Sequence, residues 1–185
     1  MSTLVPQDRS TPAMTDDGAD LLALVELALE EARTLGASQA EAGISMDVGL
    51  SVSARLGEVE TIEYQRDRGM GVTVYFGTRK GSASTADLSA KALRETVLKA
   101  CTIAKYTSED PCAGLHDPED LARDIPSLDL SHPWDISPEA ACEMAIACEA
   151  AAMAVDRERI TNSEGAAVST HRGTRAYGNS LGFLA

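Results

Sequence analysis

Residues 50–88 constrain the fold more than any other part of the chain, because they contain three β-type runs separated by turn signals. Over residues 50–56, apolar residues alternate with serines and an arginine, which is the period of a half-buried strand. In the next run, Ile62 and Tyr64 share one face while Val59 falls on the other. A β-bulge near Val59 would bring all three side chains to the same face.

Two glycine-containing segments separate the later runs of this stretch. Asp67-Arg68-Gly69 predicts a hairpin turn, since glycine tolerates the positive φ that such turns need. Residues 77–81 predict a second turn, which leads into a run of small residues. Between the two turns Val72, Val74 and Phe76 alternate with polar or aromatic residues. The whole stretch therefore predicts an antiparallel meander.

Three helices are predicted around this meander. The first follows a cap at Thr15 or Asp16 and carries apolar residues at spacings of three and four. The second follows Ser89, and the third follows Ser137, with proline at its first position and an acid in its first turn. The helix that follows Ser137 is rich in alanine and apolar on nearly all sides. The predicted helices span residues 16–35, 90–106 and 138–156.

The remaining segments complete the prediction of an α+β fold, in which three main helices pack an antiparallel or mixed sheet. Residues 40–48 predict a weaker strand that leads through Gly49 into the meander. We expect two further strands around a turn at His171-Arg172-Gly173. These strands would be residues 159–162 and 174–178. The predicted organisation is a disordered leader at 1–15 and one domain at 16–185, with a long proline-rich, acidic loop at 107–137 and the start of a strand region at 158–185.

Charge and cysteine content restrict the classes of partner. The net charge of −13 argues against binding to nucleic acid or to an anionic membrane, both of which need clustered Lys and Arg. The four cysteines form no C-x-x-C pair, and the absence of a basic and apolar leader argues against secretion. No apolar run approaches the roughly 20 residues of a membrane span. These features predict a cytoplasmic protein that does not bind membranes.

No familiar catalytic motif occurs in the sequence. It contains no H-E-x-x-H, no G-x-S-x-G, no P-loop and no dinucleotide fingerprint. His116, His132 and His171 all lie in predicted loops or turns. A small-molecule enzyme that uses a loop pair such as His116 and Asp117 is one hypothesis, but exposed loop histidines without a catalytic role are the simpler interpretation. The sequence predicts neither a catalytic residue nor a metal ligand.

Polar residues near the end of the chain form the candidate binding site. The segments Asn162-Ser163-Glu164-Gly165 and Gly178-Asn179-Ser180 place similar residues around the two strands predicted there. Such side chains can hydrogen-bond a peptide laid along a strand edge. The alternative is that both segments are turns whose side chains serve only their own backbone. The candidate peptide-binding residues are Asn162, Glu164, Asn179 and Ser180.

Several segments, in this order along the chain, resemble one known family. They are SVSARLGEVETIEY, GMGVTVYFGTRKGSASTADLS, AKYTSEDPCAGL and RITNSEGAAVSTHRGTRAYGNSLGF. Together they resemble the TldD/PmbA family, and its PmbA (TldE) branch more closely than its TldD branch. The resemblance covers residues 20–185. Because the chain ends in an apolar run without a cap, we also expect it to be an amino-terminal portion that lacks the carboxy-terminal domain.

The resemblance implies a function at the level of a complex. The family forms a TldD–TldE heterodimer, a zinc-dependent peptidase that degrades unfolded peptides and matures peptide antibiotics of the microcin type. The zinc motif belongs to the TldD-like partner subunit, so the resemblance implies no zinc ligand in this chain. The alternative that it implies is an interaction protein without hydrolytic activity, described as a modulator of DNA gyrase through an antitoxin.

Overall fold

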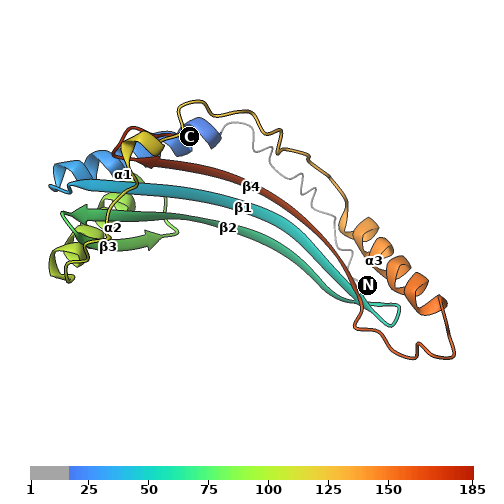
Figure 1. Ribbon diagram of the computed structural model, residues 1–185. Coiled ribbons are helices and arrows are strands. Elements are labelled where there is room, and N and C mark those ends of the chain that lie inside the picture. Colours follow the sequence, from blue (N-terminus) through green and yellow to red (C-terminus); the bar gives the residue numbers. More distant parts are fainter. Residues whose placement is uncertain (1–16) are drawn as a thin grey trace, which may run out of the picture.

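A computed structural model describes residues 17–185, which form an arched, four-stranded sheet with helices at both of its ends (Figure 1). The strand order is β3-β2-β1-β4, and every neighbouring pair is antiparallel. This arrangement confirms the α+β fold class. The strands are β1 (Gln39–Arg55), β2 (Glu58–Phe76), β3 (Arg79–Thr85) and β4 (Ala166–Asn179); the helices are α1 (Asp17–Thr34), α2 (Ala90–Tyr106), the 3₁₀ turn η1 (Pro118–Asp120) and α3 (Pro138–Ala154).

Strands β1 and β2 form one long hairpin with a tight turn. Leu56 and Gly57 make the turn with φ angles of 53° and 80°, the left-handed pair that two-residue hairpins require. The register shifts between Ser53 and Ala54, so that Val59 pairs with Ala54. This bulge places Val59 on the same face as Ile62, which confirms the bulge expected from the alternation. Below, the end of the sheet that contains this turn is called the hairpin end.

Three predicted breaks in the strands are wrong. Asp67-Arg68-Gly69 lies inside β2, where Gly69 pairs with Ser45. The segment His171-Arg172-Gly173 lies in the middle of β4, and Gly49 is an interior residue of β1. Residues 159–162 form no strand. Each of these segments contains residues that favour turns in isolation, but pairing with neighbouring strands fixes an extended backbone and overrides that preference.

The main core lies at the end of the sheet opposite the hairpin turn, under α1 and α2 (Figure 1). Helix α1 contributes a buried stripe that includes Val25 and Ala28, and α2 contributes one that includes Leu93 and Val97. Ser89 caps α2 by accepting a hydrogen bond from the Ala92 N–H at 3.3 Å. The sheet contributes Ala40, Ala42, Ile44, Met70, Val72, Val74 and Ala176. These residues lie on one face, which we call the helix face.

Helix α3 covers the same face near the hairpin end. Ser137 caps it as predicted, and Ala141 packs on Leu50 and Val52 of β1. The buried Glu149 accepts hydrogen bonds from the backbone N–H groups of Leu56 and Gly57, both at 2.9 Å. These bonds lower the pKa of Glu149 below its ordinary value. Helix α3 is thereby attached to the β1–β2 turn through a charged cap.

The predicted leader at residues 1–15 and the cap at Thr15 or Asp16 lie outside the described residues. Between α2 and α3, residues 107–137 contain η1 and otherwise irregular chain, which passes along the sheet from one end to the other (Figure 1). Among the helices of residues 17–185, none combines the length and the apolar character that crossing a membrane would require.

Candidate functional site

The face of the sheet opposite the helices carries the polar groups of the candidate site. We call it the polar face. It presents the odd-numbered residues of β1, of β4 and of β2 from Thr61 onward, because side chains alternate along a strand. At one level across the sheet the polar face presents Tyr177, Gly43 and Gly71, and two residues further along β1 it presents Arg175, Ser45 and Gly69.

A carboxylate bridges two tyrosines at one border of this surface. Tyr75 donates a hydrogen bond to Glu41 Oε1 at 3.1 Å, and Tyr177 donates one to Glu41 Oε2 at 2.8 Å. Burial raises the pKa of Tyr75 to about 12, with a further contribution from the charge of Glu41. The pKa of Tyr177 is also raised, first by burial and then by its hydrogen bond to Glu41. Both phenols are therefore hydrogen-bond donors at neutral pH.

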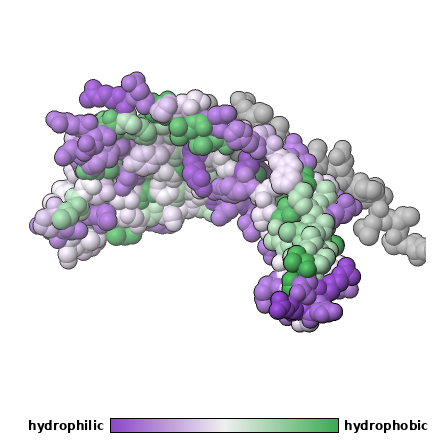
Figure 2. All heavy atoms as spheres, turned by 45° about the vertical axis from the view of Figure 1, so that its right-hand side comes forward, coloured by the Kyte–Doolittle hydropathy of each residue, from purple (hydrophilic) through white to green (hydrophobic). Residues whose placement is uncertain are grey.

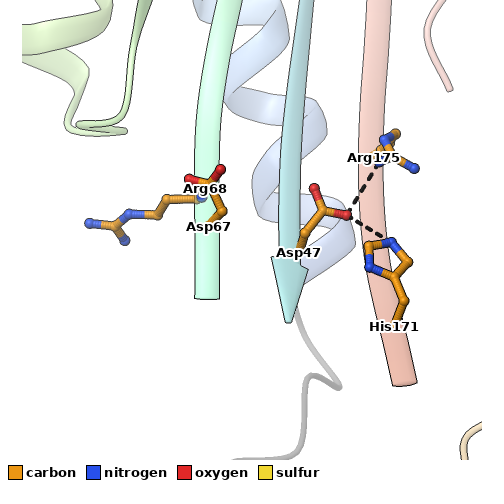
Figure 3. A network of polar contacts seen from close by, with 5 residues as sticks. All are labelled: Asp47, Asp67, Arg68, His171 and Arg175. Carbon is orange, nitrogen blue, oxygen red and sulfur yellow. Dashed lines mark hydrogen bonds and ion pairs between the residues drawn. The ribbon is translucent and has the colours of Figure 1, made fainter. Parts of the chain in front are cut away.

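A second polar cluster lies on the other side of Gly43, around Asp47. The Asp47 carboxylate contacts His171 Nε2 at 3.2 Å and Arg175 Nη2 at 3.3 Å (Figure 3). Asp67 pairs with Asp47 across β1 and β2, and the side chain of Arg68 points away from the cluster (Figure 3). Gly173 makes room for these contacts, because a Cβ there would lie 2.5 Å from Asp47 Oδ1. Exposed ion pairs of this kind contribute only about 0.2–1 kcal/mol.

A shallow depression of about 700 Å³ lies between the two clusters. Gly43, Gly69 and Gly71 lie side by side in its floor, and we call it the glycine depression. Tyr177 and Arg175 border it on β4, and Ser84 and Thr85 belong to its β3 side. A smaller adjoining hollow of about 250 Å³ extends toward Glu41 and Thr73. A site of this total size accommodates a few amino-acid side chains.

The four predicted peptide-binding residues lie at opposite ends of β4. Asn162 and Glu164 are exposed and precede β4 at the hairpin end, whereas Asn179 ends the strand. Because Asn179 lies thirteen positions after Ala166 along β4, the two groups are roughly 40 Å apart. The expectation of matching positions around paired strands is therefore wrong, since residues 159–162 form no strand and β4 is continuous.

The side chains of Asn179 and Ser180 make local contacts at the end of β4. Asn179 Oδ1 accepts hydrogen bonds from the N–H groups of Leu181 and Phe183, at 3.0 and 3.3 Å. Ser180 Oγ accepts one from the Ala40 N–H at 2.9 Å. Asn179 is buried, and its Nδ2 has no hydrogen-bond partner within the described residues. The structure leaves Asn162 and Glu164 accessible, whereas Asn179 already binds the backbone that follows it and Ser180 binds the backbone of β1.

Sequence reasoning missed the residues of the polar face. Glu41 and Asp47 lie in a segment predicted as a weak strand, and Tyr75 and Tyr177 lie in predicted strands. A usable signal was present, because Glu41, Ser45 and Asp47 alternate with Ala42, Ile44 and Met46. That alternation predicts one polar and one apolar face.

An apolar surface lies at the hairpin end on the helix face. Figure 2 shows apolar residues gathered over the end of the molecule that contains α3. Helix α3 buries only Ala141, Ala145 and Glu149, so most of its apolar residues are exposed. The exposed large apolar side chains at this end are Leu56, Val59, Ile62, Tyr64, Met144 and Val155.

The donor groups present do not fit a catalytic metal. Within residues 17–185, no group of three or more His, Cys, Asp or Glu side chains could hold a metal ion. His171 shares its Asp47 partner with the cation Arg175, which opposes binding of a second cation. His116 Nδ1 lies 2.9 Å from the backbone oxygen of Asp117, so this histidine is not oriented by a carboxylate.

Comparisons with known proteins give consistent results. Two sequence-family models match: PmbA/TldA metallopeptidase domain 1 over residues 40–104, and PmbA/TldA metallopeptidase central domain over residues 131–185. Metalloprotease PmbA of Escherichia coli O157:H7 is 51% identical over 145 residues, which are 78% of this chain and 32% of that protein. A Metalloprotease PmbA homolog of Haemophilus influenzae is 45% identical over 179 residues, 97% of this chain and 39% of that protein.

Solved structures share the fold at low sequence identity. A putative modulator of DNA gyrase from Bacteroides thetaiotaomicron superposes with a TM-score of 0.72 at 22% identity, covering 92% of this chain and 38% of that one. TldE from Thermococcus kodakarensis gives a TM-score of 0.70 at 18% identity, covering 88% and 36%. The present chain thus spans about a third of the length of the curated relatives that it matches.

Proposed function

Because this chain belongs to the PmbA/TldD family, we propose that it is the amino-terminal part of a PmbA (TldE)-like subunit in a zinc-dependent peptidase complex. The observation that carries the proposal is the match of two metallopeptidase domain models, together with 45–51% identity to relatives named as metalloproteases. The substrates proposed are unfolded peptides, including precursors of peptide antibiotics, and the compartment proposed is the cytoplasm.

In this proposal the chemistry and the substrate contacts lie on different subunits. Zinc, when bound, supplies the activated water for peptide hydrolysis. The donor set of residues 17–185 does not fit that ion, so we assign zinc to a TldD-like partner. The role left to this chain is to bind and orient the peptide.

The sheet supplies a backbone surface suited to that role. Strand β3 pairs with β2 only from Met70 to Phe76. Within residues 17–185, the edge of β2 from Glu58 to Gly69 has no neighbouring strand on the side away from β1. Free N–H and C=O groups along such an edge can pair with an extended peptide of any sequence. An edge of this kind suits a protein that binds unfolded chains.

Asn162, Glu164, Asn179 and Ser180 remain proposed peptide contacts at the two ends of β4. Asn162 and Glu164 are accessible, and contact at Asn179 would require its unpaired amide Nδ2. Replacing both Asn162 and Asn179 by Ala should raise KM for peptide hydrolysis by the complex. Unchanged turnover and KM in this double variant would show that neither residue lines the peptide path.

The experiment that tests the proposed function is hydrolysis of an unfolded fluorogenic peptide with zinc present. The full-length protein is assayed alone and mixed with a TldD-like partner. We expect hydrolysis only in the mixture, and loss of hydrolysis on chelation. Hydrolysis by the full-length protein alone would contradict the assignment of zinc to the partner.

A second candidate function is that of an interaction protein without hydrolytic activity. The observation that favours it is the fold shared with a protein described as a putative modulator of DNA gyrase. Under this alternative the chain would bind an antitoxin, and the mixture with the TldD-like partner would show no zinc-dependent cleavage. The same assay therefore separates the two functions.

A further inference from the structure

The outer side of β2 has no neighbouring strand near the hairpin end. Within residues 17–185, β3 pairs with β2 only from Met70 to Phe76, so residues 58–69 of β2 form a free edge (Figure 1). Phe76 and Arg79 flank a two-residue turn and form a hydrogen-bonded pair, so every second residue of β2 presents its N–H and C=O groups to β3. The same series of outward-facing backbone groups continues along the free edge through Arg68, Arg66, Tyr64 and Ile62.

The side chains on the helix face of this edge follow one another in a regular order. Because side chains alternate along a strand, the free edge presents Glu60, Ile62, Tyr64 and Arg66 on that face. All four are exposed, Ile62 by 52% and Tyr64 by 70%. Neither Glu60 nor Arg66 forms an ion pair within residues 17–185. The order is therefore an acid, two apolar residues and a base, at intervals of two residues.

A second copy of the same edge that runs antiparallel matches this order. If Ile62 of one copy lies opposite Tyr64 of the other, then Glu60 of each copy lies opposite Arg66 of the other. Pairs of opposite charge and pairs of an aliphatic with an aromatic residue stabilise a sheet at such cross-strand positions. A register shifted by two residues would place Ile62 opposite Arg66, or Tyr64 opposite Glu60. The side-chain order thus favours one register, in which the two-fold axis passes between the two Glu63 residues.

The surroundings of the edge leave it accessible. Helix α3 packs through Ala141 on Leu50 and Val52 of β1, one strand in from the edge. Residues 58–68 of β2 are all exposed. Charged side chains on an edge normally prevent pairing with another chain. On the helix face of this edge the charges have both signs and are separated along the strand, so they favour antiparallel pairing instead.

Two charge effects oppose the pairing. Each copy carries a net charge of −13, but at physiological ionic strength repulsion between charges is screened beyond a distance of about 8 Å. On the polar face the two Glu63 carboxylates would lie opposite each other, which is unfavourable. That single contact between like charges is outnumbered by the two contacts between Glu60 and Arg66.

We propose that residues 58–69 of β2 pair antiparallel with the same residues of a second copy of this chain, with Ile62 opposite Tyr64. The two sheets then join into one continuous sheet, and the exposed apolar side chains of the edge are covered. This proposal does not rest on the proposed function, because it concerns the edge while no peptide is bound. A peptide that pairs with the same edge would compete with the second copy.

Reversal of the charges tests the pairing. The full-length protein is studied by sedimentation velocity at physiological ionic strength, without a TldD-like partner and without peptide. Glu60→Arg and Arg66→Glu each bring like charges together at both contacts, so each should weaken self-association at least about tenfold. The double variant restores opposite charges and should recover the affinity of the wild type. Glu26→Arg, at an exposed position of α1, makes the same change in net charge and should leave self-association unchanged.

Disulfide formation tests the register. In the proposed register the two Glu63 residues form a pair without mutual hydrogen bonds, whose Cα atoms lie about 4.5 Å apart, within the range of a disulfide. Glu63→Cys, in a protein whose exposed Cys112 and Cys148 are replaced by Ser, should therefore form a linked dimer on oxidation. The matched control is Thr61→Cys on the same face. Its two thiols would lie more than about 10 Å apart, so it should form no linked dimer.

Several outcomes would overturn the proposal. These are a wild type that stays monomeric, self-association that neither charge reversal weakens, no recovery in the double variant, or equal linking of Glu63→Cys and Thr61→Cys. A monomeric wild type whose Glu60→Arg variant fails to bind the TldD-like partner would identify that partner as the occupant of the edge instead. Because no hydrolysis is measured, failure of the proposed function would leave these results unchanged.

Discussion

Gly81→Ala should be one of the most destabilising single-methyl changes available in this sheet. A Cβ at position 81 would overlap the Ala100 oxygen and the Ala104 nitrogen, both of which are backbone atoms of α2. Neither atom can move by a rotamer change, so α2 must shift away from β3. That shift loosens the packing of Leu93 and Val97, which are fully buried. Overpacking typically costs 1–3 kcal/mol, and a backbone clash belongs near the upper limit, at about 3 kcal/mol.

The assay is urea unfolding of wild type, Gly81→Ala and the matched control Gly71→Ala. Gly71 lies on the neighbouring strand with open space above it. The control should be more stable than wild type by about 0.4–1 kcal/mol, because alanine reduces the entropy of the unfolded chain. For a domain of this size, the loss at Gly81 corresponds to a Tm lower by roughly 6–12 °C. A loss of stability below about 1 kcal/mol in Gly81→Ala would refute the reasoning that α2 must shift away from β3 at a large cost in packing.

Three further predictions concern charged and aromatic groups. Because the Gly57 and Leu56 N–H groups lower the pKa of Glu149 below 4.5, its carboxylate stabilises the fold above pH 4.5, and this contribution is lost as pH falls. Glu149→Gln should therefore lower the urea midpoint at neutral pH. It should also make the decrease of that midpoint between neutral and acidic pH smaller than in the wild type. A decrease of the same size in both proteins would contradict this. Burial and Glu41 raise the pKa of Tyr75 from 10.0 to about 12, so its contribution to stability is complete below pH 10 and is lost as pH rises toward 12. The tyrosinate absorbance difference between wild type and Tyr75→Phe should accordingly show its step near pH 12, and a step near pH 10 would disprove the burial argument. Gly173→Ala should separate Asp47 from His171 and change stability by no more than about 0.5 kcal/mol. In the Gly173→Ala protein, the additional substitution Asp47→Asn should no longer shift the NMR signals of the His171 ring. A shift of these signals would show that Asp47 and His171 are still in contact.

Local sequence signals sufficed for the helices and for one unusual feature of the sheet. Helix α2 has the predicted bounds, because Ser89 supplies a cap and apolar residues recur at helical spacing. The bulge opposite Ala54 followed from Val59 being out of phase with Ile62 and Tyr64. In both cases the deciding interaction lies within a few residues along the chain, where the sequence records it directly.

The length of the strands could not be predicted in the same way. Glycine at positions 49, 69 and 173 resembles a turn when each residue is considered alone. In the folded chain Gly49 accommodates the backbone of Thr170, and Gly173 accommodates the carboxylate of Asp47. Those neighbours are more than 100 residues distant in sequence, so no local pattern identifies them. The candidate site was missed for the same reason, since Glu41 meets Tyr75 and Tyr177 only through strand pairing.

The glycines also supply a criterion that separates those required by packing from those that are not. If the packing of the chain requires a glycine, an added methyl group lowers stability, because backbone atoms of a neighbouring element must move. If open space lies above a glycine, the same methyl group raises stability, because alanine reduces the entropy of the unfolded chain. Gly81 and Gly71 represent the two cases on neighbouring strands of one sheet. Stability changes of opposite sign at these two positions are therefore expected, although both substitutions add the same methyl group.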